Sequence, residues 1–219
     1  MSVRPSIVFQ QLFETKSSTY TYLLADPVSK EAVLIDPVLE TIDRDLKLVS
    51  ELTLKLKYVL DTHIHADHVT AAGEIRKRLS VKTGVAKNAN VPCVDIYLKD
   101  GDVIRFGQLE IMVLETPGHT DASLSFYCSG MVFTGDALLI RGCGRTDFQS
   151  GSPEVLYKSV TKKLFQLPPE TLVYPAHDYK GFTSSTIGAE ILHNPRLGNN
   201  KSLAEFVEIM NNLKLPYPQ

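Results

Sequence analysis

The stretch Thr62-His63-Ile64-His65-Ala66-Asp67-His68 holds three of the chain's six histidines and an aspartate within seven consecutive positions. It follows residues 57–61, whose apolar centre is typical of a buried strand. In residues 68–79 the apolar side chains recur at helical spacing, which predicts a helix directly after the stretch. Side chains can converge on one point at such a strand-to-helix turn. Imidazole and carboxylate bind zinc and non-haem iron, so the stretch predicts a metal site rather than a solvated polar loop.

Three further candidate ligands, His119, Asp136 and His177, each follow another strand-like run and precede a break in the pattern. A single histidine in such a place is usually an ordinary polar loop residue. The ends of strands in one sheet, however, bring such side chains to a common rim. Together with the first stretch, these residues predict a metal centre whose ligands arrive from several directions.

In type and order these residues resemble the metal-binding motifs of the metallo-β-lactamase superfamily. The first motif corresponds to His63, His65, Asp67 and His68, and the later ones to His119, Asp136 and His177. The resemblance runs from about Ile7 to His177 with no ligand missing. It implies an α/β fold, an αββα sandwich of two mixed sheets with helices on the outer faces and the metal at one edge.

The segment after Asp136 resembles one family of that superfamily, the persulfide dioxygenases. Residues 137–149 read Ala-Leu-Leu-Ile-Arg-Gly-Cys-Gly-Arg-Thr-Asp-Phe-Gln, and similar matches occur at 177–183, 194–197 and 205–213. The resemblance implies oxidation of glutathione persulfide by dioxygen and water to sulfite and glutathione, as in sulfide detoxification. It also implies a homodimer with one Fe(II) per chain, bound by His63, His119 and Asp136. His65, Asp67, His68 and His177 would then orient the ligands and bound water through hydrogen bonds.

Two alternatives stay open on the sequence. The ligand set is also that of a dinuclear zinc site, so a thioester hydrolase of the glyoxalase II type is the first alternative. Those enzymes typically carry a larger helical C-terminal domain, whereas only 42 residues follow His177 here. The second alternative is a binding protein that kept the fold and lost the chemistry, against which the intact ligand set argues.

Candidate substrate contacts lie in the same motif segments. Arg145 follows glycines that allow close backbone approach, and its guanidinium can bind a carboxylate of glutathione with two donors. Tyr179 is placed to direct a hydroxyl toward the persulfide, and Arg196 to hold the other end of the tripeptide. Cys143 is expected near the pocket without a catalytic role.

Composition favours a globular protein that binds neither nucleic acid nor membrane. The 219 residues are 43% hydrophobic and 22% charged, which predicts one domain over residues 1–219 with a short helical extension from about 183. The formal net charge is −2, which disfavours nucleic-acid binding. No secretory signal and no membrane-spanning run is recognisable. The three cysteines form no C-x-x-C pair, which favours a reduced, cytoplasmic protein, or the mitochondrial matrix for a eukaryotic chain without its transit peptide.

Periodicity predicts the remaining elements. Strands are expected at residues 7–9, 20–24, 32–35 and 103–106, and helices at 42–52, 152–165 and 202–213. Ser152 with Pro153 is a typical helix start, and Leu167-Pro168-Pro169 a typical stop.

Overall fold

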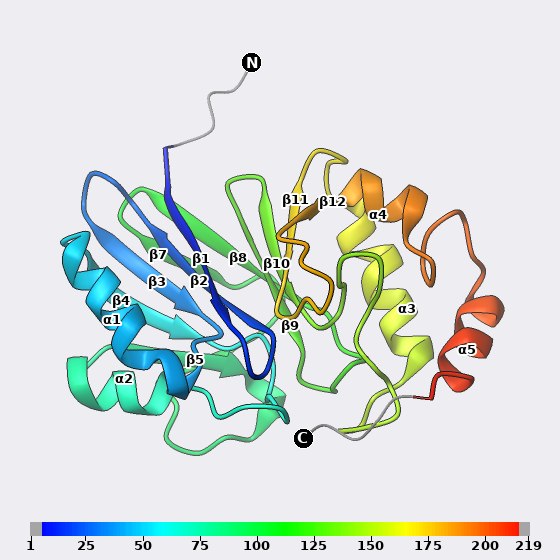
Figure 1. Ribbon diagram of the computed structural model, residues 1–219, viewed down its shortest axis with the longest axis horizontal. Coiled ribbons are helices and arrows are strands. Elements are labelled where there is room, and N and C mark those ends of the chain that lie inside the picture. Colours follow the sequence, from blue (N-terminus) through cyan, green and yellow to red (C-terminus); the bar gives the residue numbers. More distant parts are fainter. Residues whose placement is uncertain (1–5, 215–219) are drawn as a thin grey trace.

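Two six-stranded sheets pack face to face in the computed structural model, which describes residues 6–214 (Figure 1). The first sheet has the order β1-β2-β3-β4-β5-β6, with antiparallel pairs from β1 to β3 and parallel pairs from β3 to β6. Its strands are β1 (Val8–Glu14), β2 (Thr19–Ala25), β3 (Glu31–Ile35), β4 (Lys55–Leu60), β5 (Lys82–Ala86) and β6 (Ile96–Leu98).

The second sheet has the order β12-β11-β10-β9-β8-β7, and within it only the β10–β11 pair is parallel. Its strands are β7 (Val103–Phe106), β8 (Leu109–Glu115), β9 (Leu124–Cys128), β10 (Met131–Gly135), β11 (Leu172–Pro175) and β12 (Ser185–Thr186). Both sheets are therefore mixed, and the predicted αββα sandwich is confirmed.

Helices cover the outer face of each sheet (Figure 1). The first sheet carries α1 (Ile42–Glu51) and α2 (Ala72–Leu79), and the second α3 (Pro153–Lys162), α4 (Ile187–His193) and α5 (Leu203–Asn211). Short 3₁₀ turns occupy Leu39–Thr41, Lys87–Ala89 and Leu164–Gln166. None of these helices has the length and apolar character needed to cross a bilayer.

Strand β2 shows how the sequence builds these layers. All seven of its residues are buried, because alternate side chains face opposite sides of the sheet. Tyr20, Tyr22 and Leu24 enter the core between the sheets. Leu23 and Ala25 pack on the other side, in the cluster that includes the helices α1 and α2. Both faces of the strand are therefore buried, and its threonine hydroxyls find protein partners, as Thr21 does by donating to the Asp36 carbonyl (2.9 Å).

The helix expected at residues 68–79 begins only at Ala72, so its predicted start was wrong. Tertiary hydrogen bonds hold the preceding residues in an extended path. The Leu39 N–H donates to the Val69 carbonyl (2.9 Å), and the Ala71 N–H to the Pro37 carbonyl (2.7 Å). Val69, which the helical pattern placed on an apolar face, is 60% exposed. The histidine stretch therefore lies in a long irregular turn and not on a helix.

The other predicted elements are present, the strand at 103–106 with the predicted bounds and the rest with shifted ends. The helix expected at 152–165 is α3 followed by a 3₁₀ turn, and Ser152 caps it by accepting from the Val155 N–H (3.3 Å). The helix expected at 202–213 is α5, and a capping box formed by Ser202 and Glu205 stabilises its N-terminus. The segment after residue 183 also adds β12 to the edge of the second sheet.

Candidate metal centre and substrate pocket

The candidate ligands meet at one edge of the sandwich, where four strands end. His63 follows β4 of the first sheet. His119, Asp136 and His177 follow β8, β10 and β11 of the second sheet. These three therefore lie at a common rim of one sheet, as expected. His63, His119 and Asp136 each offer one ligand atom, and these atoms lie within 4.8 Å of one another. The edge therefore presents two imidazoles and one carboxylate to a single point, with one imidazole from the opposite sheet.

His63 is oriented by Thr62 and Asp36. The Thr62 hydroxyl donates to an Asp36 carboxylate oxygen (2.8 Å), so it accepts from His63 Nδ1 (3.0 Å). This leaves Nε2 of His63 for a metal. Burial, followed by the neighbouring His65, holds the pKa of His63 well below its ordinary value. The imidazole is therefore neutral and keeps the lone pair that a ligand needs.

His119 is oriented by the backbone of the following loop. Its Nδ1 donates to the Arg145 carbonyl (2.7 Å), so Nε2 carries the free lone pair and lies 3.6 Å from Oδ2 of Asp136. Gly144 makes this contact possible, because a Cβ there would lie 2.7 Å from His119 Nδ1. A larger residue at this position would collide with His119.

Asp136 has one oxygen committed to His177. Its Oδ1 accepts from His177 Nδ1 (2.7 Å), which leaves Oδ2 on the side of His119. Burial opposes its ionisation, but the surrounding histidines, led by His177, outweigh burial and hold the Asp136 pKa far below its ordinary value. Asp136 is therefore an anion with one oxygen available to a metal.

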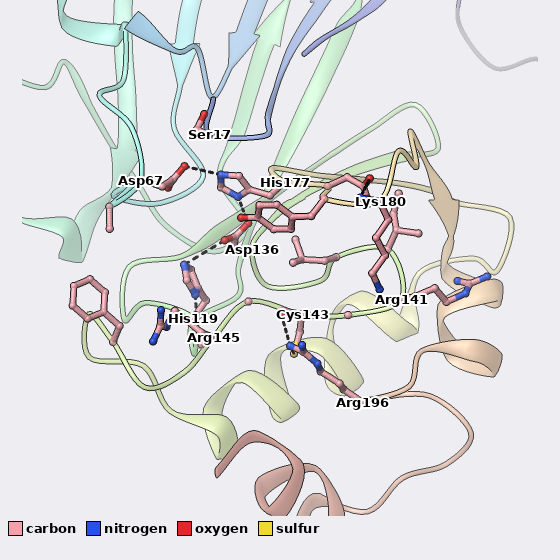
Figure 2. A pocket seen from close by; sticks show the side chains of 18 of the residues that line it. Ser17, Asp67, His119, Asp136, Arg141, Cys143, Arg145, His177, Lys180 and Arg196 are labelled. Carbon is pink, nitrogen blue, oxygen red and sulfur yellow. Dashed lines mark hydrogen bonds and ion pairs between the residues drawn. The ribbon is translucent and has the colours of Figure 1, made fainter. Parts of the chain in front are cut away.

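Among the other four motif residues, His65, Asp67, His68 and His177, the last three are joined by hydrogen bonds through Asp67. Oδ2 of Asp67 accepts from His68 Nδ1 (2.9 Å) and from His177 Nε2 (2.9 Å), and Figure 2 shows His177 between Asp67 and Asp136. Burial opposes a charge on His177, but the carboxylates of Asp136 and Asp67 outweigh it and raise the pKa of His177 to about 10. His65, Asp67, His68 and His177 each offer one ligand atom, and these atoms lie within 4.8 Å of one another, so they form a second group that could hold a metal.

Two buried nitrogens in the described part of the chain lack a protein partner, Nδ1 of His65 and Nε2 of His68. His65 Nε2 lies 3.2 Å from Asp36. Buried polar atoms in native proteins are nearly always satisfied, so water or an ion belongs beside these two nitrogens. The donor set of the edge therefore fits a metal centre with additional bound groups.

The sequence profile of the metallo-beta-lactamase superfamily matches residues 15–177, which include every candidate ligand. The chain belongs to this superfamily. It is 52% identical over 215 residues to the mitochondrial persulfide dioxygenase ETHE1 of Homo sapiens, covering 97% of this chain and 84% of the human protein. The crystal structure of ETHE1 from Myxococcus xanthus is 55% identical with a TM-score of 0.94, covering 96% of this chain and 93% of that one. A hydroxyacylglutathione hydrolase of Cereibacter sphaeroides is 36% identical over 172 residues, which cover 74% of this chain and 64% of the hydrolase.

Beside the superfamily's metal motifs lies a cavity of about 450 Å³, large enough for a small peptide ligand. His119, Asp136 and His177 reach it, whereas His63, His65 and His68 lie deeper and do not line it. One wall consists of the seven consecutive residues 139–145, which include the predicted pocket residue Cys143. Figure 2 shows several cationic side chains around this cavity, among them Arg145, Lys180 and Arg196.

The three predicted substrate contacts all line the cavity. Arg145 holds Asp147 with two donors, Nε (2.7 Å) and Nη2 (2.8 Å). The Tyr179 ring lies parallel to the His177 ring with centroids 6.0 Å apart, and the residue is 70% exposed, so it is not a core residue. Arg196 donates from Nη1 to the Cys143 carbonyl (2.8 Å).

Sequence reasoning missed several residues of this site. Asp36, which directly follows the predicted strand at 32–35, was not predicted as a site residue, although it orients His63 through Thr62 and contacts His65. Lys16, Arg141 and Lys180 line the cavity but lie outside the predicted contacts. An aspartate directly after a buried strand, before Pro37, was a usable signal for Asp36, since buried carboxylates need several partners.

Proposed function

We propose that this chain is a persulfide dioxygenase, which oxidises glutathione persulfide with dioxygen and water to sulfite and glutathione. The observation that carries the proposal is identity of 51–52% to mammalian persulfide dioxygenases over 97% of the chain. The ETHE1 crystal structure supports it at the level of the fold, and the hydrolase relative is more distant. The binding-protein alternative loses support from the intact ligand group.

We further propose that His63, His119 and Asp136 hold one Fe(II) per chain. These two imidazoles and one carboxylate would hold ferrous iron, which would supply the electron transfer between persulfide and dioxygen that side chains perform poorly. The choice of one ion rather than two rests on the family resemblance, because His65, Asp67, His68 and His177 also offer ligand atoms within 4.8 Å of one another.

The remaining polar residues have supporting tasks in this proposal. His177 fixes Asp136 through Oδ1, so that the other oxygen faces the ligand group. Asp67 holds His68 and His177 in place. Second-sphere partners of this kind usually set metal affinity and ligand orientation. His65 and His68, with one unpartnered nitrogen each, are placed to hold the water that the reaction consumes.

We keep Arg145, Tyr179 and Arg196 as proposed contacts for glutathione, because all three line the cavity. The salt bridge of Arg145 to Asp147 means that a substrate carboxylate must share or replace that partner. Arg145→Ala should weaken glutathione binding about tenfold or more, the size expected for a hydrogen bond to a charged group. Titration calorimetry with glutathione tests this, and unchanged affinity would remove Arg145 from the contacts.

The decisive experiment measures oxygen uptake by protein purified without oxygen and assayed with glutathione persulfide. We expect persulfide-dependent oxygen consumption, sulfite as product and one iron per active chain. Hydrolysis of S-lactoylglutathione by the same preparation tests the zinc hydrolase. The hydrolase assignment would replace the dioxygenase assignment if the protein hydrolysed the thioester, showed no persulfide-dependent oxygen uptake and held two tightly bound zinc ions per chain.

We also propose a single domain over residues 1–219 with a helical extension from about 183, a homodimer, and a cytoplasmic location, or the mitochondrial matrix in a eukaryotic cell. Light scattering tests the dimer against the chain mass of 24.3 kDa, and a mass near that of one chain would contradict it.

A further inference from the structure

The cavity wall formed by residues 139–145 begins with a tight turn, residues 139–142, that contains an unfavourable backbone conformation. Leu139 and Gly142 close the turn with reciprocal N–H to carbonyl bonds of 3.1 and 3.2 Å. Arg141 lies in the left-handed region with φ 55°, which is uncommon for a residue with a Cβ. Such a conformation persists only where surrounding contacts enforce it. Contacts from elsewhere in the chain must therefore hold this wall.

Three consecutive residues of the wall are each held by one side chain from the segment after residue 183. The Arg141 N–H donates to Oε2 of Glu190 (3.0 Å). Nδ2 of Asn194 donates to the Gly142 carbonyl (2.9 Å). Arg196 adds its bond to the Cys143 carbonyl, so the backbone of the wall is fixed residue by residue.

The Glu190 carboxylate is the centre of this arrangement. It is fully buried, and it accepts from the Arg141 guanidinium and N–H, from the Ser185 hydroxyl (2.5 Å) and from Asn194 Nδ2 (2.9 Å). All four partners are donors. Only an ionised carboxylate, which accepts at both oxygens and donates at neither, satisfies them together.

The wall continues directly into the metal centre. The Gly144 N–H donates to the Asp136 carbonyl (2.7 Å), and the Arg145 carbonyl accepts from His119 Nδ1. Two of the three proposed iron ligands are therefore bonded to the two residues that follow the held turn. Figure 2 shows Arg141, Cys143 and Arg145 along this path from the C-terminal segment to His119.

We propose that Glu190 and Asn194 are positioning residues of the active site, which hold the 141–143 backbone so that the cavity fits the glutathione part of the substrate. The proposal rests on the proposed function. In it the segment after residue 183 acts on the substrate through the wall, and Arg196 serves both the wall and the cavity.

The test uses variants of nearly unchanged shape, Glu190→Gln and Asn194→Asp, in the iron-loaded full chain. The first places an amide N–H₂ against donors, and the second a carboxylate oxygen against the Gly142 carbonyl and Glu190. The matched control is Asp45→Asn, which makes the same change at a buried carboxylate of α1 held by Arg44 and Thr41. Each protein is assayed for KM, kcat, glutathione affinity by calorimetry, and melting temperature, at a temperature where all are folded.

We expect Glu190→Gln and Asn194→Asp to raise KM and weaken glutathione binding about tenfold, with a smaller change in kcat, while Asp45→Asn leaves both unchanged. Unchanged KM and glutathione affinity in both wall variants would overturn the proposal. So would an equal change in the control, because the effect would then follow lost stability. If wild type shows no persulfide-dependent oxygen uptake, the proposed function fails, and calorimetry with glutathione still decides the positioning role.

Discussion

At the residue scale, the histidines of the centre differ in which nitrogen already has a partner. Nδ1 of His63 and of His119 donates to an oxygen of the protein, which leaves Nε2 available in both. Each nitrogen of His177 lies within 2.9 Å of a carboxylate oxygen. In the proposed iron site His63 and His119 are ligands and His177 orients Asp136, so residues of the same type have different tasks.

This difference predicts opposite metal contents for two substitutions. His119→Ala removes one of three ligands, so we expect loss of iron and of oxygen uptake. His177→Asn removes a partner of Asp136 and Asp67 but none of the three proposed ligands, so iron should remain bound with affinity lowered about 10- to 100-fold, and activity should fall. Elemental analysis of both variants after gel filtration is the measurement. Equal loss of metal from both would contradict the proposed three-residue ligand set.

At the element scale, the loop between β10 and α3 unites the metal centre and the cavity wall. Gly142 and Gly144 both lie in it, but their surroundings differ. A Cβ at Gly144 would lie 2.5 Å from the Asp136 carbonyl oxygen and 2.7 Å from His119 Nδ1. A Cβ at Gly142 would meet nothing closer than Leu139 at 3.8 Å.

We therefore expect Gly144→Ala to displace His119 and to lower kcat/KM at least about tenfold, since overpacking at a tight contact costs on the order of 1–3 kcal/mol. Gly142→Ala should retain near wild-type iron content and activity, because there is room for the methyl group. Steady-state oxygen uptake and iron content measure both effects. Full activity of Gly144→Ala would mean that this contact does not position the ligand.

At the scale of the whole molecule, the sequence predicted the sandwich and the meeting of ligands better than the residues that support them. The strand ends predicted the shared rim of His119 and Asp136, and the family resemblance placed His63 with them, although it follows a strand of the other sheet. The helix start at Ala72 was not, because bonds to Pro37 and Leu39 override the apolar spacing. The Arg141–Glu190 pair joins residues 49 positions apart, and no local pattern indicates such a contact.

The buried carboxyl of Asp61 makes the stability of the whole chain depend on pH. It is buried beside Asp36, and its Oδ1 accepts from the Thr70 hydroxyl (2.9 Å). Burial, followed by the charge of Asp36, raises the pKa of Asp61 to about 8. An unfolded aspartate has a pKa of about 3.9. Between these values the folded chain binds one proton more than the unfolded chain, so rising pH lowers its stability.

Asp61→Asn should remove this dependence, because the amide is neutral at every pH and its carbonyl can still accept from Thr70. From about pH 4 to 8 wild type should lose up to roughly 1.4 kcal/mol of unfolding free energy per pH unit relative to the variant. The two proteins should be similarly stable near pH 4, and the variant more stable near pH 9. Urea unfolding of both proteins in the same metal state, at several pH values across this range, measures the difference. Parallel stability curves would show that Asp61 is already ionised in the folded chain, with its charge compensated by the neighbouring polar groups.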